Sequence, residues 1–96
     1  MALKIIWTTQ AEKGLNTVLD YLEKEWTVTE ILKLETNLVN LLNRIVEYPN
    51  GCPKSKIKTD LHKGLVDKNN YIIYRVNSRL NQIVIINFRG TKQKTL

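Results

Sequence analysis

The residues of this chain that are best suited to chemistry lie in its second half, where cations surround a single histidine, His62. Residues 49–96 contain ten lysines and arginines and two aspartates, for a net charge of +8. Residues 1–48 contain five basic and seven acidic side chains, for a net charge of −2. This asymmetry predicts an anionic partner for the second half, either a nucleic acid or an acidic protein segment. The alternative is a solvated basic surface that has no partner.

One reaction open to such residues is the metal-free cleavage of RNA by its own 2′-hydroxyl. It needs a base for the hydroxyl, cations for the phosphate and an acid for the leaving oxygen. The candidate bases are His62 and Asp60, and the candidate acids are His62 and Tyr74. The candidate phosphate-binding cations are Lys63, Arg75 and Arg89. Any basic domain of this size offers a similar set, so the pattern has low specificity.

Other chemistries find no support in the sequence. There is no glycine-rich phosphate loop, no pair of Cys or His at metal-ligand spacing and no serine-centred nucleophile motif, so we expect neither a metal nor a cofactor. Cys52 is the only cysteine, which fits an inert thiol in a reducing cytoplasm.

We see no signal peptide and no run of the roughly 18 apolar residues that a membrane span needs. We expect one domain over residues 1–96.

The first half of the chain is expected to form a strand and two helices. Residues 3–7 are a short β-type run. Thr9 to Glu12 has the form of a capping box, and residues 11–26 place apolar side chains at helical spacing. A second capping-box pattern at Thr27 to Glu30 begins the next helix, which Tyr48-Pro49 ends. The two helices should form an antiparallel hairpin.

The second half is expected to form a sheet centred on a hairpin from Tyr71 to Gly90, in which two runs rich in Ile, Val, Tyr and Phe flank a polar turn. Alternation places Arg75 on one face with Tyr71, and Tyr74 on the other. Residues 61–66 supply a further strand. The predicted fold class is α+β, a small antiparallel sheet in the order β-α-α-β-β-β with the helical hairpin on one face.

The second helix has more apolar residues than one buried face requires. Leu32, Val39 and Val46 widen its apolar arc, which indicates a docking surface for a partner. In the first helix, Gly14 costs somewhat under ~1 kcal/mol relative to alanine, and a close approach to a neighbouring element would explain it.

With these elements in place, the chain resembles toxins of the RelE/ParE superfamily, from bacterial type II toxin–antitoxin systems. The resemblance covers nearly the whole length. It rests on Ile-Ile-Trp-Thr at residues 5–8 before the first helix, on Tyr48-Pro49, on Asn-Asn-Tyr-Ile-Ile-Tyr-Arg-Val at residues 69–76, and on Gly-Thr-Lys-Gln at residues 90–93. The segment from Tyr71 to Val76 is the most specific part.

The resemblance implies a cytoplasmic toxin that arrests growth, in systems that include plasmid-stabilisation modules, and that a cognate antitoxin neutralises by wrapping its surface. RelE-like members cut messenger RNA in the ribosome with a set of Lys, Arg and Tyr residues. ParE-like members lack that set and act on DNA gyrase. An antitoxin with an acidic or amphipathic segment is therefore the expected partner, and Leu32, Val39 and Val46 are its expected docking residues.

The departures from the family pattern favour the ParE-like branch. Aligned on Tyr74, the RelE-type cations fall at His62, Gly64, Tyr71 and near Thr91, and none of these is a lysine or arginine. A ParE-like branch often ends in Asp-Thr-Arg-Gln-Asn, where this chain has Gly for Asp and Lys for Arg. The favoured target is thus DNA gyrase. The expected target or nucleic-acid contacts are Lys63, Arg75, Arg89, Lys92 and Lys94.

Two alternatives stay open at this point. One is a RelE-like, ribosome-dependent mRNA endoribonuclease with His62, Arg75 and Arg89 as catalytic residues. The other is a degenerate toxin that only binds its antitoxin. The sequence also leaves open whether the free protein forms a homodimer.

Overall fold

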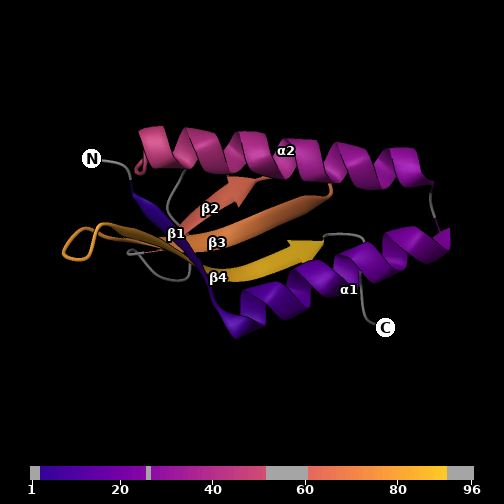
Figure 1. Ribbon diagram of the computed structural model, residues 1–96, viewed down its shortest axis with the longest axis horizontal. Helices are drawn as coiled ribbons and strands as arrows, with labels where there is room; N and C mark the ends of the chain where they lie inside the picture. The colour runs from indigo at the N-terminus through magenta and orange to yellow at the C-terminus, as the bar shows by residue number, and fades with distance from the viewer. Residues whose placement is uncertain (1–2, 26, 52–60, 91–96) are drawn as a thin grey trace.

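The computed structural model describes residues 3–25, 27–51 and 61–90 as one layer of helices on one layer of sheet (Figure 1). The element order confirms the predicted β-α-α-β-β-β arrangement. The elements are β1 (Lys4–Trp7), α1 (Thr9–Glu25), α2 (Val28–Glu47), β2 (His62–Leu65), β3 (Asn70–Asn77) and β4 (Gln82–Gly90). Cys52 and the segment from Lys54 to Asp60 lie outside the described residues.

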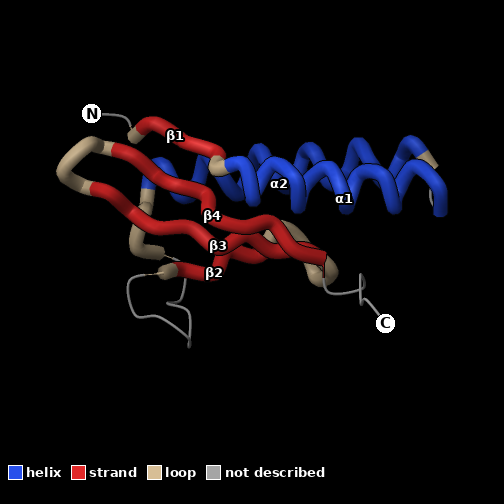
Figure 2. The backbone as a smooth tube through the Cα atoms, turned by 90° about the horizontal axis from the view of Figure 1, so that it is seen from below, coloured by secondary structure: helices blue, strands red, loops and turns tan. Residues whose placement is uncertain are grey.

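The four strands form one sheet in the order β1-β4-β3-β2, so the β3–β4 hairpin lies in the middle, as predicted. Both helices cover the same face, and the opposite face carries no helix of the described chain (Figure 2). The prediction of a purely antiparallel sheet is wrong at one edge, because β1 pairs with β4 in parallel, with Ile5 opposite Ile83. The chain between β1 and β4 passes through both helices, β2 and β3, which is longer than the connection that a parallel pair requires. The hydrophobic pattern does not encode the parallel direction.

The core lies between the helices and the sheet. Its strand residues include Ile72 and Tyr74 on β3 and Ile83 and Ile85 on β4, all fully buried. From the helices come Ala11, Val18, Leu34, Leu38, Leu41 and Ile45. The α2 positions recur every three or four residues and the two α1 positions are seven apart, so the predicted apolar stripes are the faces that the helices bury.

A β-bulge in β4 changes which of its side chains face the core. Tyr74 pairs with Ile85, but Ile73 pairs with Asn87, so Ile86 is an extra residue in the ladder. Without it, strict alternation after Ile85 would turn residue 87 inward. With it, Phe88 faces the core and is 2% exposed. The backbone N–H of Phe88 donates to Asn87 Oδ1 over 3.0 Å beside the bulge.

The two helix starts differ from the predicted capping boxes. In α1 the cap is Thr8, one residue before the predicted Thr9. Thr8 Oγ1 accepts from the N–H of Ala11 over 3.1 Å and donates to the carbonyl oxygen of Ile85 over 2.8 Å, which ties the start of α1 to β4. In α2 the cap residue is Thr27, as predicted, but its side chain makes no capping hydrogen bond.

Gly14 brings α1 into contact with the backbone of β4. A Cβ built on Gly14 would lie 2.2 Å from the carbonyl oxygen of Phe88, and a backbone atom held in a central strand cannot move aside easily. The expectation of a close approach at Gly14 is therefore confirmed.

We predict that Gly14→Ala destabilises the protein even though alanine is the better helix former by about 1 kcal/mol. The overlap with Phe88 must be relieved by moving α1, and we expect a net loss of about 1–3 kcal/mol. Urea unfolding followed by circular dichroism measures it. The control is Asn16→Ala, at an exposed position of the same helix, which should be neutral or stabilising. A Gly14→Ala protein as stable as the control would contradict the close contact.

Candidate functional site

The uncovered face of the sheet is the candidate functional site, and we call it the open face. The described strands contain four charged side chains, all cationic and all exposed, and no carboxylate. They are Lys4, Lys63, Arg75 and Arg89. Each of the four is next in the chain to a residue that faces the core, so alternation turns all four to the open face. These neighbours are Ile5, His62, Tyr74 and Phe88.

Two of these cations, Lys63 and Arg89, gather around Tyr71 at one end of the open face. Lys63 Nζ lies 4.4 Å from the centroid of the Tyr71 ring, within the range of a cation–π interaction. Arg89 is directly opposite Tyr71 in the β3–β4 ladder, so their Cβ atoms are roughly 5 Å apart. The lysine, the ring and the guanidinium thus form a compact group, which we call the Tyr71 group.

Arg75 lies farther along β3, opposite Val84, toward the hairpin turn. Ile73 lies between Arg75 and Tyr71 on the same face of β3. Ile73 and Val84 are half-buried on this face, and Leu65 is 60% exposed. The open face therefore combines cations with an apolar middle, so its full burial needs a partner that is anionic and also offers apolar surface.

His62 and Tyr74 lie on the other face of the sheet, in the core. His62 is 5% exposed, and its ring stacks on that of Tyr74 with centroids 5.1 Å apart and planes 15° apart. The Tyr74 hydroxyl donates to the carbonyl oxygen of Pro49 over 2.9 Å, which ties the sheet to the end of α2. The structure thus brings Arg75 and Arg89 to one face but separates His62 from both. These three do not form one catalytic cluster.

Lys63 lies between the two positions that the resemblance, aligned on Tyr74, compares with RelE-type lysines. Those positions are His62 and Gly64, and both are buried on the helix side of the sheet. Lys63, between them, is the cation that β2 turns to the open face. Asp60, Lys92 and Lys94 lie outside the described residues.

Sequence reasoning left Tyr71 and Lys4 out of the list of contacts. The signal for Tyr71 was present, because it shares its strand and its face with Arg75. Arg89 was included for its charge alone. Its face depends on the bulge at Ile86, which no pattern in the sequence marks.

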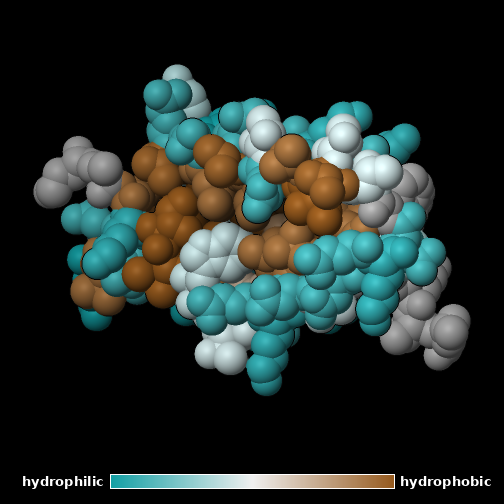
Figure 3. Space-filling model, turned by 45° about the vertical axis from the view of Figure 1, so that its right-hand side comes forward, coloured by the Kyte–Doolittle hydropathy of each residue, from teal (hydrophilic) through white to brown (hydrophobic). Residues whose placement is uncertain are grey.

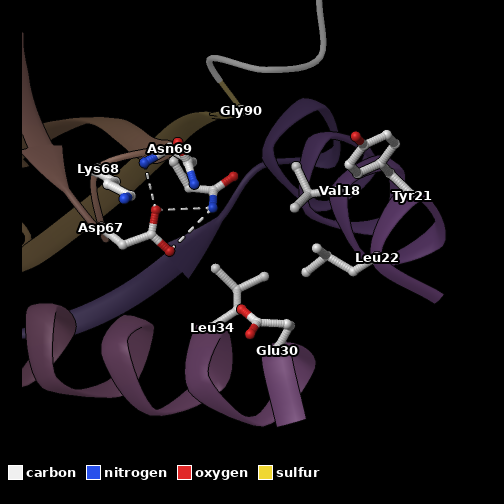
Figure 4. Close-up of a pocket in the computed structure, with 10 residues that line it drawn as sticks. Val18, Tyr21, Leu22, Glu30, Leu34, Asp67, Lys68, Asn69 and Gly90 are labelled. Atoms are coloured by element: carbon white, nitrogen blue, oxygen red, sulfur yellow. Dashed lines mark hydrogen bonds between the residues drawn. The ribbon is translucent and has the colours of Figure 1, made fainter. Parts of the chain in front are cut away.

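One cavity of about 280 Å³ lies on the helix side of the sheet, where both helices meet the β2–β3 turn (Figure 4). Val18 and Leu22 from α1 and Leu34 from α2 form its apolar walls, and Glu30 and Asp67 bring carboxylates to it. Asp67 is engaged within the turn. Its Oδ1 accepts from the N–H of Asn69 over 2.7 Å, and both of its oxygens accept from Asn70 Nδ2. The polar wall of this cavity is therefore formed by the hydrogen-bonded turn between β2 and β3.

Among the described residues, no three or more His, Cys, Asp or Glu side chains group in a way that could hold a metal ion. Of the helices described, neither has the length and apolar character needed to cross a membrane.

Comparison with known proteins identifies solved structures that have this architecture. No protein-family model matches the chain, and no curated protein matches it. Solved structures do share its fold. The YoeB/ParE toxin from Agrobacterium tumefaciens matches with a TM-score of 0.65 and 13% identity, over 92% of this chain and 98% of that toxin.

Two further structures agree. The archaeal RelE–RelB complex from Pyrococcus horikoshii OT3 contains a chain that matches at a TM-score of 0.62 and 13% identity, over 98% of this chain and 100% of that one. The YoeB dimer from Staphylococcus aureus matches at 0.63 and 20% identity, over 93% of this chain and 97% of the other. The chain thus shares its fold with these toxin structures.

We predict that His62 and Arg89 differ in what they do for stability. His62→Ala removes a buried ring from the core and should lower the free energy of unfolding by roughly 1–3 kcal/mol. Arg89→Ala changes an exposed side chain and should leave it within about 0.5 kcal/mol. Urea unfolding of both variants beside the parent protein makes the comparison. Equal stability of His62→Ala and the parent would refute the structural role of His62.

Proposed function

We propose that this chain is the growth-arresting toxin of a type II toxin–antitoxin system and that it acts through the open face of its sheet. The observation that carries the proposal is the set of four exposed cations, without a carboxylate in any described strand, on the uncovered face. The shared fold supports it, because the matched structures are toxins of such systems or their complexes. A cognate antitoxin that shields this face would neutralise the toxin.

The charges and apolar residues of the open face determine the kind of surface that a partner needs. Four like charges on one surface repel one another, and an anionic partner relieves that repulsion as well as making its own contacts. The half-buried Ile73 and Val84 add apolar area between the cations. An antitoxin segment that covers this face is therefore acidic with interspersed apolar residues.

We propose DNA gyrase as the target, following the ParE-like branch. Two observations support this choice. The family positions for the RelE-type cations carry His62, Gly64 and Tyr71 instead. In addition, the histidine that could have moved a proton is packed in the core against Tyr74. On this account the open face binds its target and performs no proton transfer.

The second candidate is a ribosome-dependent mRNA endoribonuclease, and the Tyr71 group favours it. A lysine and an arginine on either side of an aromatic ring suit a phosphate and a stacked base. Lys63 and Arg89 would stabilise the charge on the phosphate, and the Tyr71 hydroxyl would serve in proton transfer. In this version the catalytic residues are on the open face, and His62 has no catalytic role.

Pulse-labelling of DNA and protein synthesis after induction of the chain alone separates these targets. We expect DNA synthesis to fall first, because gyrase inhibition blocks replication before translation. A first fall in protein synthesis would replace gyrase by the ribosome. If neither falls while the protein is soluble and folded, the chain is an inactive member that only binds an antitoxin, and the toxin proposal fails.

A further inference from the structure

The cavity beside the β2–β3 turn is lined from four separate segments of the chain. Val18 and Leu22 come from α1, Glu30 and Leu34 come from α2, residues 67–70 come from the turn and the start of β3, and the end of β4 completes the wall (Figure 4). A molecule in this cavity is therefore contacted from several sides. Small-molecule sites in proteins are concave and mostly apolar with a few placed polar groups, and this lining has the same make-up.

The apolar surface elsewhere on the molecule is of a different kind. A broad apolar area bordered by hydrophilic side chains crosses the face shown in Figure 3. Leu32 and Val39, two of the docking residues expected from the sequence, are 56% and 54% exposed on α2, and the third, Val46, is half-buried there. None of these three residues lines the cavity, so the cavity is a separate feature.

The apolar wall of the cavity is held in place by the core. Val18 and Leu34 are 3% and 2% exposed, and Leu22 packs against the same core while it stays half-buried. The volume of the cavity is about 280 Å³. Because an apolar cavity of roughly 150 Å³ accommodates benzene, this one has room for an aromatic ring and a short chain.

Glu30 brings to the cavity a carboxylate that no described residue engages. Its half-buried side chain reaches the cavity beside Leu34 (Figure 4), and it makes neither a hydrogen bond nor an ion pair with the described part of the chain. The predicted capping box would join this carboxylate to the N–H of Thr27. Instead, the backbone N–H of Glu30 donates to the carbonyl oxygen of Thr27 over 3.0 Å. A negative charge in the first turn favours α2, and the carboxylate oxygens stay available as acceptors.

Asp67 and Lys68 determine the remaining charge of the cavity. Asp67 is already held by hydrogen bonds from Asn69 and Asn70. Among the described residues that line the cavity, Lys68 is the one cation, and its side chain is exposed. Two carboxylates and one ammonium group leave the lining with a formal charge of −1. Because Glu30 has the uncommitted oxygens, the lining suits a cation and disfavours an anion.

We propose that the cavity binds a small organic cation in which a short chain joins an aromatic ring to an amine. The ring packs on Val18, Leu22 and Leu34, and the ammonium group donates to the carboxylate of Glu30. Burial of the ring supplies affinity, and the charge-assisted hydrogen bond supplies selectivity for amines. This binding goes beyond the proposed function and does not depend on it, because the cavity lies on the helix side of the sheet, away from the open face.

Three probes with the same ring test the assignment. Phenethylamine carries a cation, phenethyl alcohol is neutral, and hydrocinnamate carries an anion on a chain of similar length. Titration of the purified protein, followed by two-dimensional NMR of its backbone amides, gives the affinity and the location of each probe. We expect a Kd of about 1 mM for the amine, about tenfold weaker binding of the alcohol and no binding of the anion. The amides of Val18, Asn70 and Gly90 should shift, and the amide of Arg75 on the open face should not.

Single substitutions connect the preference for the amine to Glu30. Glu30→Gln keeps the size of the side chain, and it should weaken binding of the amine about tenfold while the alcohol binds as before. The control Glu35→Gln, at an exposed position of the same helix, should bind all three probes as the parent does. Lys68→Ala, also at an exposed position, removes the neighbouring cation and should bind the amine more tightly. Circular dichroism confirms that each variant is folded.

Several results would overturn the assignment. They are no saturable binding of the amine, equal affinities for the amine and the alcohol, an unchanged preference in Glu30→Gln, or shifts that avoid the cavity. Tighter binding of N-acetylarginine amide than of phenethylamine would also overturn it, because a basic side chain of a partner would then be the occupant. These titrations do not measure growth arrest, so their failure leaves the proposed function untouched. A chain that binds the amine without arresting growth contradicts the proposed function alone.

Discussion

One extra residue in a central strand decides which side of this sheet carries Arg89. Up to Ile85, alternation sends every second residue of β4 into the core, and Ile86 then shifts the phase by one. The shift buries Phe88 beneath Gly14 of α1 and turns Arg89 outward beside Tyr71. The bulge therefore determines both the contact between Phe88 and Gly14, which positions α1, and the placement of Arg89 beside Tyr71 on the open face.

The charges of the domain are distributed unevenly between its sheet layer and its helical layer. The described strands hold four cations and no acid, whereas α1 holds four acidic and two basic residues, and α2 holds three acidic and two basic. Between these layers the core is apolar, apart from groups such as His62 and Asn70. The two layers thus differ in charge, with cations on the strands and an excess of acidic residues on the helices.

Much of this architecture can be predicted from the sequence, because it follows from the periodic spacing of apolar residues. Leu34, Leu38, Leu41 and Ile45 are buried where the helical spacing places them, and Arg75 lies outside where alternation places it. What periodicity cannot give is long-range pairing. The parallel direction of β1, the cap at Thr8 that bonds to Ile85 and the bulge at Ile86 all depend on strands far apart in the chain.

The candidate site shows the same division. Lys63, Arg75 and Arg89 were selected for their charge, and in the structure they share one face. His62 was selected because histidine is a versatile catalyst, yet residue type carries no information about the face. Its pairing opposite Tyr74 is set by the register of β2 against β3, and that register puts it in the core. Lys63, its neighbour, is turned outward by the same register.

The most direct test of the account compares growth arrest by two variants that lose the same charge from different surfaces. One is Lys63→Ala/Arg75→Ala/Arg89→Ala on the open face, and the other is Lys13→Ala/Lys33→Ala/Arg44→Ala on the helices, with circular dichroism confirming that both are folded. The account predicts that the first variant no longer arrests growth and that the second does so as the parent chain does. Arrest by the open-face variant at the parent level would contradict the central claim.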